Sequence, residues 1–249
     1  MGGTLGVLPT ARRRFLLPFL DQRIETPTTA TFRFDRTSSG YEFRSNQAIR
    51  LGLRVDDPWG PYRLFSLSSS PTETDWISVT CKLTGTPFKQ ALRGLRRGDT
   101  AEVIGPLGDL VYDPSRPTIM IAGGIGVTPF RGMIRFAVDS GFDQPIRLLY
   151  SARVPEEFAF REELDAMSGA HPDLGIVYSV TRPGTSRTPW TGRTGRIGEA
   201  AIREAAEPLD EPNFLVVGLP EMVSETVTLL GSRMAVPEER INWEPFRGF

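Results

Sequence analysis

The pattern of apolar residues changes its period near the middle of this 249-residue chain. Up to about residue 113, apolar and polar residues alternate, as in TFRFD (31–35), IRLGLRV (49–55) and WISVTCKL (76–83). Alternation of this kind, interrupted by clusters of Pro, Gly, Ser and Asp, is typical of antiparallel strands with one buried face. The first part is therefore predicted to form a small antiparallel barrel or sandwich, with one short helix within FKQALRGL (88–95).

Beyond YDPSRP (112–117), short apolar runs alternate with helical patterns, which predicts a parallel sheet with helices on both of its faces. The boundary between the two parts is expected near Asp113 to Pro117. The predicted strands are TIMIA (118–122), IRLLY (146–150), LGIVYSV (174–180) and FLVVG (214–218). The predicted helices lie within residues 128–141, 156–167, 197–206 and 221–234. In the first helix one apolar face is formed by Phe130, Met133, Ile134, Ala137 and Val138.

Composition narrows the chemistry that is expected of the chain. The formal net charge of −1 gives no field that favours nucleic acid or an anionic membrane, and no apolar run reaches the roughly 18 residues of a membrane span. Cys81 and His171 are the single cysteine and histidine, so an internal disulfide, a four-thiolate iron–sulfur cluster and a His-rich zinc site are not expected. No metal site is predicted, and an organic cofactor is expected to carry any redox chemistry.

A glycine-rich turn follows the first strand of the second part, at Gly123, Gly124 and Gly126. These glycines let the backbone turn sharply and approach a bulky anion. Thr128 is predicted as the N-cap of the next helix and Pro129 as its first residue, so that the helix amides point at the turn. The spacing differs from the GxGxxG fingerprint, and on local sequence alone a plain strand–turn–helix connection remains the alternative.

Four further segments decide between these readings: YRLFSLSSSP (62–71), GPLGDL (105–110), VVGLPEMV (216–223) and INWEPFRGF (241–249). In this order and spacing they resemble the ferredoxin–NADP reductase family of FAD-dependent oxidoreductases, from about Arg14 to Phe249. The resemblance implies a β + α/β fold. We expect a flexible tail (1–12), then an antiparallel β-barrel FAD-binding domain (13–114), and then a doubly wound parallel-sheet NAD(P)-binding domain (115–249).

The RLFS segment resembles the family's Arg-x-Tyr-Ser flavin motif, with phenylalanine in place of tyrosine. The resemblance implies that Arg63 pairs with the FAD pyrophosphate, that Phe65 packs against the isoalloxazine ring and that Ser66 hydrogen-bonds near flavin N5. Cys81 alternates with core residues and is predicted to be a small buried hydrophobe. The FAD contacts implied in all are Arg63, Leu64, Phe65, Ser66, Thr80, Cys81, Lys82, Gly85, Thr86, Pro87, Phe88, Lys89, Thr128, Phe246 and Phe249.

The glycine turn would bind the pyrophosphate of a nicotinamide nucleotide, with Thr128 near both cofactors. Arg182 matches the place where NADP-preferring members carry an arginine for the 2′-phosphate, and Arg153 is its expected helper; the alternative is that both are solvated loop charges. NADPH is therefore predicted in preference to NADH. The implied nucleotide contacts are Gly123, Gly124, Gly126, Thr128, Pro129, Ser151, Arg153, Arg182, Gly218, Leu219, Pro220 and Met222.

Two segments depart from the family pattern or extend it. VVGLPEMV resembles a Cys-Gly-Pro-Pro-x-Met signature with Val217 in place of the cysteine and Leu219 in place of the first proline. WEPF resembles the family's Glu-x-Tyr or Glu-x-Phe ending, which implies that Phe246 covers the flavin and that Glu244 lies beside it; Phe249 is an alternative cover. The other interpretation is a last edge strand with two exposed aromatic residues.

These residues define the expected function, with Ser66, Thr128, Glu244 and Phe246 as its catalytic residues. The leading hypothesis is a cytoplasmic enzyme that takes hydride from NAD(P)H onto flavin N5 and passes electrons singly to a ferredoxin, a flavodoxin or an oxygenase component. One alternative is a flavin-binding regulatory or sensor subunit without NAD(P)H turnover, which Val217 and Leu219 suggest. Another is a reductase of a quinone, free flavin or ferric chelate. The oligomeric state is not predicted.

Overall fold

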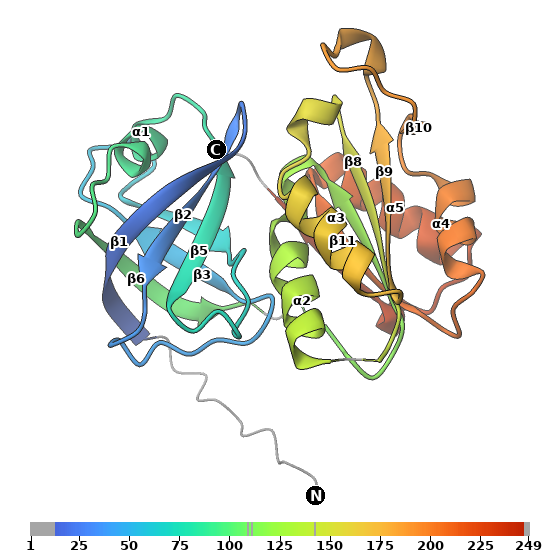
Figure 1. Ribbon diagram of the computed structural model, residues 1–249, viewed down its shortest axis with the longest axis horizontal. Coiled ribbons are helices and arrows are strands. Elements are labelled where there is room, and N and C mark those ends of the chain that lie inside the picture. Colours follow the sequence, from blue (N-terminus) through green and yellow to red (C-terminus); the bar gives the residue numbers. More distant parts are fainter. Residues whose placement is uncertain (1–12, 109, 111, 142, 247–249) are drawn as a thin grey trace, which may run out of the picture.

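The computed structural model describes residues 13–108, 110, 112–141 and 143–246. A barrel of antiparallel strands stands beside a parallel sheet with helices on both faces (Figure 1). This is the β + α/β fold expected from the change of period. The predicted tail of residues 1–12 and the candidate flavin cover Phe249 lie outside the described residues.

The first part is a barrel and not a sandwich. Its six strands pair in the order β4-β3-β6-β1-β2-β5, and a bridge between Leu67 and Val79 joins the two ends of this sheet. The alternating apolar residues predicted to share one face, including Phe32, Phe34 and Ile49, are buried in one core. The elements are β1 (Arg13–Thr26), β2 (Thr29–Asp35), β3 (Ala48–Gly52), β4 (Tyr62–Ser66), β5 (Trp76–Lys82), α1 (Pro87–Arg93) and β6 (Thr100–Leu107).

Strand β1 was not predicted, although it pairs with both β2 and β6. Leu17 and Phe19 point into the barrel core, but Leu16 and Ile24 are 69% and 60% exposed on the outer side. An apolar run with residues on both faces carries no period-two signal, and Pro18 within it argues against a central strand. Tertiary pairing therefore creates a strand where the local pattern gave none.

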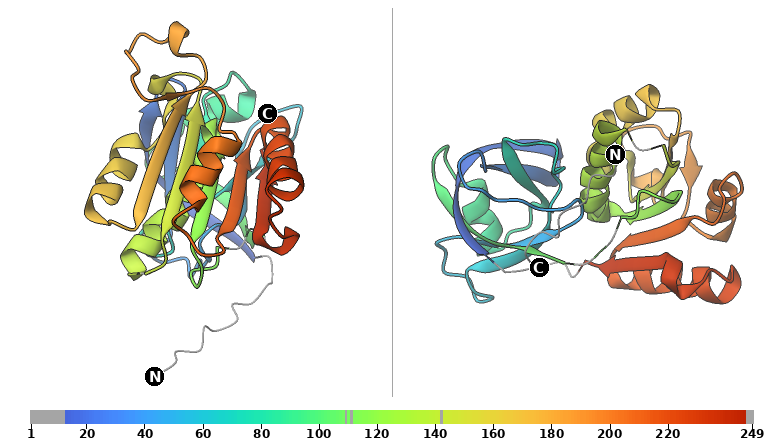
Figure 2. Two further views of the ribbon diagram at one scale, coloured as in Figure 1. Left: turned by 90° about the vertical axis from the view of Figure 1, so that its right-hand side faces the viewer. Right: turned by 90° about the horizontal axis from the view of Figure 1, so that it is seen from below.

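The second part is a six-stranded sheet in the order β10-β9-β8-β7-β11-β12, with every pair parallel. Helices α2 and α3 cover one face and α4 and α5 the other (Figure 2). The strands are β7 (Thr118–Gly123), β8 (Ile146–Ala152), β9 (Leu174–Val180), β10 (Arg193–Thr194), β11 (Asn213–Gly218) and β12 (Ile241–Pro245). The helices are α2 (Val127–Ser140), α3 (Arg161–Ala170), α4 (Glu199–Ala206) and α5 (Pro220–Thr228).

Two of the predicted helices have different bounds in the structure. The helix expected within residues 156–167 begins only at Arg161, because Phe160 has a left-handed backbone with φ of 62° and the preceding turn is separate. The helix expected within residues 221–234 ends at Thr228 and continues as one wider π turn. The apolar periodicity marks these helices but not their ends.

The predicted division after residue 114 falls between β6, the last barrel strand, and β7, the first strand of the parallel sheet. That residues 13–114 and 115–249 form two separate domains remains a prediction. Within the described ranges, no helix is both long enough and apolar enough to cross a membrane.

Candidate flavin and nicotinamide site

The barrel and the parallel sheet meet where β4 ends. The Ser66 hydroxyl lies 3.4 and 3.5 Å from the two carboxylate oxygens of Glu244 and donates toward them. Glu244 is part of β12 and pairs in register with Val217 of β11. Ser66, predicted from the flavin motif, and Glu244, predicted from the chain ending, are therefore brought together from opposite parts of the chain, 178 residues apart.

Next to Ser66, the edges of β4 and β5 are not paired with each other along their length. β4 pairs with β3 and β5 pairs with β2, and the described pairing between β4 and β5 is the single bridge at Leu67. The backbone of residues 62–66 and that of residues 80–82 thus face the same opening of the barrel. This arrangement suits the implied FAD contacts of Thr80, Cys81 and Lys82, which remain predictions.

Arg63 is held by an acidic residue that sequence reasoning missed. Its guanidinium forms an ion pair with Asp57 at 2.5 Å, with 10% and 0% of the two side chains exposed. Asp57 also accepts hydrogen bonds from the backbone amides of Trp59 and Phe88 at 2.8 and 2.9 Å. Burial alone would raise the pKa of Asp57, but these amides and Arg63 lower it below its usual value. Asp57 therefore stays charged and fixes the Arg63 fork.

Helix α1 and the residues before it contain five of the implied FAD contacts, Gly85 to Lys89. Thr86 is its N-cap, and the Thr86 side chain accepts from the Lys89 amide at 3.4 Å; Pro87 is the first helical residue. Gly85 has open space where a side chain would lie. Phe88 was an implied FAD contact, but its amide donates to Asp57 and its ring is fully buried in the barrel core.

Lys89 lies almost completely buried, 8% exposed, in the neighbourhood of Arg63. Burial is the main cause that lowers the pKa of Lys89, and the positive charge of Arg63 lowers it further. No carboxylate among the described residues forms an ion pair with this ammonium group. Two nearby buried cations, of which one lacks an acidic partner, are a donor set that fits a pyrophosphate.

The remaining predicted flavin residues are spread over the inside and the outside of the barrel. Phe65 packs against the barrel core with its ring 6.2 Å from that of Phe88, whereas Leu64 points outward and is 62% exposed. Cys81 is 5% exposed, and burial raises the pKa of its thiol to about 11. Cys81 is thus the buried hydrophobe that was predicted, and not a reactive thiol.

A cavity of about 330 Å³ opens beside the Ser66–Glu244 contact. One of its lining residues, Asn46, has a left-handed backbone with φ of 77°, a conformation that asparagine tolerates. Among the described residues, its buried Nδ2 has no hydrogen-bond partner. The lining residues are Asn46, Ala48, Gly108 and Leu110, together with Asn242, Trp243 and Glu244 of β12. An unpaired donor at this position fits a polar ligand in the cavity.

The glycine turn is shaped by close packing against the end of β11. A Cβ at Gly126 would lie 2.2 Å from the carbonyl oxygen of Val217, which excludes any side chain there. Gly124 has a positive φ of 54°. These are backbone requirements of the turn, and they place the start of α2 at the carboxyl edge of the sheet, where ligands of open α/β sheets bind.

The predicted start of α2 is wrong by two residues. The helix begins at Val127 with Gly126 as its cap, so Thr128 is not the N-cap and Pro129 is the third helical residue. The Thr128 hydroxyl donates to the carbonyl of Ile125 at 2.5 Å. Proline is still tolerated at this position because the first turn of a helix has no intrahelical acceptors for its amides.

The two predicted coenzyme arginines lie side by side. Arg153 follows β8 and Arg182 follows β9, and the Arg182 amide donates to the Arg153 carbonyl at 2.8 Å. Both residues are exposed, and neither forms an ion pair with a described residue. Ser151, at the end of β8, donates to the Ala122 carbonyl at 3.3 Å. The structure therefore brings the backbones of these two exposed arginines together at the carboxyl edge of the sheet.

The segment after β11 and the chain ending form the other side of this edge. Pro220 opens α5 as predicted, and Leu219 before it is 57% exposed. The Met222 sulfur lies close to both Gly123 and Gly218, where added Cβ atoms would be 3.2 and 2.8 Å from it. The Phe246 amide donates to the Gly218 carbonyl at 2.7 Å, so the predicted flavin cover follows directly after β12.

The fold and this site define a class: two-domain reductases in which a barrel binds a flavin and a parallel sheet binds a nicotinamide nucleotide. A family profile described as "Oxidoreductase NAD-binding domain" matches residues 120–228. The chain is 27% identical over 232 residues to ferredoxin–NADP reductase B of Sorangium cellulosum, which covers 89% of this chain and 93% of that protein. It is 31% identical over 214 residues to NADH-cytochrome b5 reductase 1 of Neosartorya fischeri, covering 80% and 68%.

A solved structure shows the same arrangement of both parts. An Amycolatopsis cytochrome P450 reductase has a TM-score of 0.81 with 21% sequence identity, and the match covers 97% of this chain and 72% of that one. The chain belongs to the ferredoxin–NADP reductase family and is an NAD(P)H-dependent flavoprotein oxidoreductase. Its cofactors are FAD and a nicotinamide nucleotide.

Proposed function

We propose that residues 13–114 bind FAD and residues 115–249 bind NADPH, and that the enzyme passes the electrons singly to a separate protein acceptor. Bound FAD supplies the conversion of a two-electron hydride donation into one-electron steps. The contact between Ser66 and Glu244 carries this proposal, because it joins the flavin motif to the carboxyl edge of the nucleotide-binding sheet.

The residues of the barrel have binding and orienting roles. Arg63, fixed by Asp57, and Lys89 would bind the pyrophosphate, and Phe65 would lie against the flavin ring. The Ser66 hydroxyl would donate near N5. Burial raises the pKa of Glu244, with the Ser66 hydroxyl opposing the shift. Glu244 therefore keeps a proton to higher pH than an exposed glutamate, and in that state it can donate to the Ser66 oxygen and leave the Ser66 proton for N5.

The residues of the sheet would align the coenzyme with the flavin. Hydride transfer needs no side-chain base, so the contribution of the protein is alignment at near-contact distance and exclusion of water. The glycine turn and the first turn of α2 would bind the coenzyme pyrophosphate, and Phe246 would cover the flavin until nicotinamide displaces it. Arg182 and Arg153, whose backbones are adjacent and which form no ion pair with a described residue, support NADPH over NADH.

A protein acceptor of the one-electron type fits the sequence and the relatives. The single cysteine of the sequence is buried and cannot supply the four thiolates of an iron–sulfur cluster, so electrons that leave the flavin need another carrier. A ferredoxin, a flavodoxin or an oxygenase component has this chemistry. The name of the Sorangium relative, a ferredoxin–NADP reductase, supports the first of these.

Acceptor profiling tests this function. With NADPH as donor, kcat/KM is measured for a ferredoxin, a flavodoxin and an oxygenase component, and for a quinone, free flavin and a ferric chelate. The proposal expects at least about a tenfold advantage for one of the protein carriers. Preference for a small molecule would assign the enzyme to that class of reductase. Bound flavin that NADPH does not reduce would instead support a regulatory subunit.

A further inference from the structure

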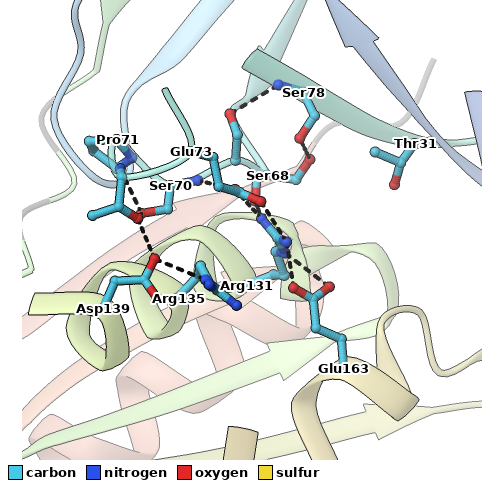
Figure 3. Close-up of polar contacts among 12 residues, drawn as sticks. Thr31, Ser68, Ser70, Pro71, Glu73, Ser78, Arg131, Arg135, Asp139 and Glu163 are labelled. Carbon is cyan, nitrogen blue, oxygen red and sulfur yellow. Dashed lines mark hydrogen bonds and ion pairs between the residues drawn. The ribbon is translucent and has the colours of Figure 1, made fainter. Parts of the chain in front are cut away.

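The barrel and the parallel-sheet domain also meet in a second contact, between the loop that connects β4 to β5 and helix α2 (Figure 3). Arg131 of α2 points out of its own domain and donates to both carboxylate oxygens of Glu73 in this loop, at 2.5 and 2.9 Å. It also donates to the carbonyl of Ser68 at 3.1 Å. One guanidinium thus binds a side chain and the backbone of the other domain.

Within its own domain, Arg131 donates to both oxygens of Glu163 on α3. The three side chains are 12%, 12% and 19% exposed. Burial alone would lower the pKa of Arg131, but the hydrogen bonds and charges of Glu73 and Glu163 raise it overall. A planar fork with five donors suits this bridging position, because it serves two carboxylates and a carbonyl together.

Neighbouring contacts fix the same pair of elements. A Cβ at Gly132 would lie 2.7 Å from the carbonyl oxygen of Ser69, so the helix and the loop backbone approach as closely as only glycine permits. About two turns further along α2, the Thr72 hydroxyl donates to Asp139 at 2.5 Å. The loop and α2 are therefore closely packed along two turns of the helix, with Arg131 at the buried end of this contact.

The loop is in turn attached to the barrel. The hydroxyl groups of Ser68 and Ser78 are 2.8 Å apart, and Thr80 donates to Ser68 at 2.8 Å. The Glu73 carboxylate accepts from the Ser70 amide at 2.7 Å, which fixes its orientation within the loop. The hydrogen-bond acceptors for Arg131 on the barrel side are thus fixed in place before the contact forms.

Both ends of this contact lie next to the proposed reacting groups. Ser68 is two residues after Ser66 at the end of β4, and Arg131 is three residues, or about one helical turn, after Thr128. We propose that Arg131 and Glu73 are positioning residues that set the distance between the flavin and the nicotinamide. This inference rests on the proposed function, because it assumes that both cofactors bind at these two elements.

Two matched variants of the flavin-loaded enzyme test it. Glu73→Gln and Glu163→Gln each remove one carboxylate charge from the same guanidinium, but only Glu73 crosses between the domains. We expect Glu73→Gln to keep its FAD and its KM for NADPH within about twofold while the limiting rate of flavin reduction falls at least about tenfold, since small misplacement of reacting atoms is costly. Glu163→Gln should slow reduction by less than about threefold.

Two further readouts separate positioning from general damage. The long-wavelength absorbance of the nicotinamide–flavin complex should weaken in Glu73→Gln and not in Glu163→Gln. Amide hydrogen exchange of residues 67–75, measured without coenzyme, should accelerate in Glu73→Gln only. If Glu73→Gln does not fold, Arg131→Lys takes its place as the test. This variant keeps the charge but loses the fork, and its reduction rate should lie between that of the wild type and the roughly tenfold loss expected for Glu73→Gln.

Equal reduction rates and equal exchange in the two glutamine variants would overturn the proposal, as would a change confined to the KM for NADPH. If NADPH does not reduce even the wild-type flavin, the proposed function fails. Hydrogen exchange then decides separately whether Arg131 and Glu73 fix the two domains together, and unchanged exchange in Glu73→Gln would reject that as well.

Discussion

The two halves of the candidate site are built differently. In the barrel, Arg63 is nine-tenths buried and already fixed by Asp57, and Lys89 is buried beside it. At the edge of the parallel sheet, Arg153 and Arg182 are exposed, and the close contacts there are made by backbone at glycines. One half is a prearranged group of buried charged side chains, and the other is a turn of closely packed backbone with exposed arginines beside it.

This difference fits the proposed binding of FAD by the barrel and of the coenzyme by the sheet. A ligand that meets prearranged, desolvated donors loses little binding energy to ordering, which suits a cofactor that stays bound through many turnovers. Exposed charged side chains contribute less binding energy because water competes for them. This suits a coenzyme that must leave after each hydride transfer. Substitutions in the barrel are therefore expected to have larger effects on binding than substitutions at the sheet edge.

The largest effect is expected for Arg63→Ala, measured as the dissociation constant for FAD. Hydrogen bonds of a charged group contribute about 1.5–3 kcal/mol, so the affinity should fall roughly tenfold to hundredfold. Arg50→Ala on the neighbouring strand β3, an exposed arginine opposite Leu64, is the matched control and should retain its FAD. An Arg63→Ala protein with full FAD content after dialysis would remove Arg63 from the site.

A smaller effect is expected for Arg182→Ala, at the exposed edge of the sheet. If its guanidinium contacts the 2′-phosphate, the KM for NADPH should rise about threefold to tenfold while the KM for NADH stays unchanged. Arg196→Ala, another exposed arginine of the same domain, serves as the control. A wild-type preference for NADH, or equal losses for both coenzymes, would show that the 2′-phosphate is not bound here.

The smallest effect is expected where the two halves meet, for Phe246→Ser. An aromatic ring on the flavin must leave before nicotinamide can stack, and such stacking contributes about 0.5–1.5 kcal/mol beyond buried area. Removing it should tighten NADP⁺ binding roughly twofold to tenfold and shift the flavin absorption spectrum. If the dissociation constant and the spectrum both stay the same, Phe246 only extends the edge strand β12.

Much of the fold could be predicted from the sequence because period and burial agree in most elements. Phe32 and Phe34 alternate into the barrel, and Phe130, Met133 and Ile134 share the buried face of α2. The start of α2 was misplaced because Thr128 and Pro129 resemble a cap and a first turn, whereas packing of Gly126 against Val217 begins the helix earlier.

The site residues that were missed depend on contacts between distant parts of the chain. Asp57 lies in DDPWG with no motif of its own, and its role appears only when β4 and α1 bring Arg63 and the Phe88 amide to it. The contact between Glu73 and Arg131 joins residues 58 positions apart in two different domains. A single sequence contains no signal for such pairs; an acidic residue shortly before Arg63 was the one available hint for Asp57.

The most direct test of the whole account is anaerobic titration of the purified, flavin-loaded protein with NADPH. If the barrel and the sheet present their cofactors to each other as described, one NADPH per flavin should bleach the visible flavin band, and NADH should do so only at higher concentration. Bound flavin that remains oxidised in the presence of excess NADPH and excess NADH would contradict the account, because the two halves of the site would then not form one reaction centre.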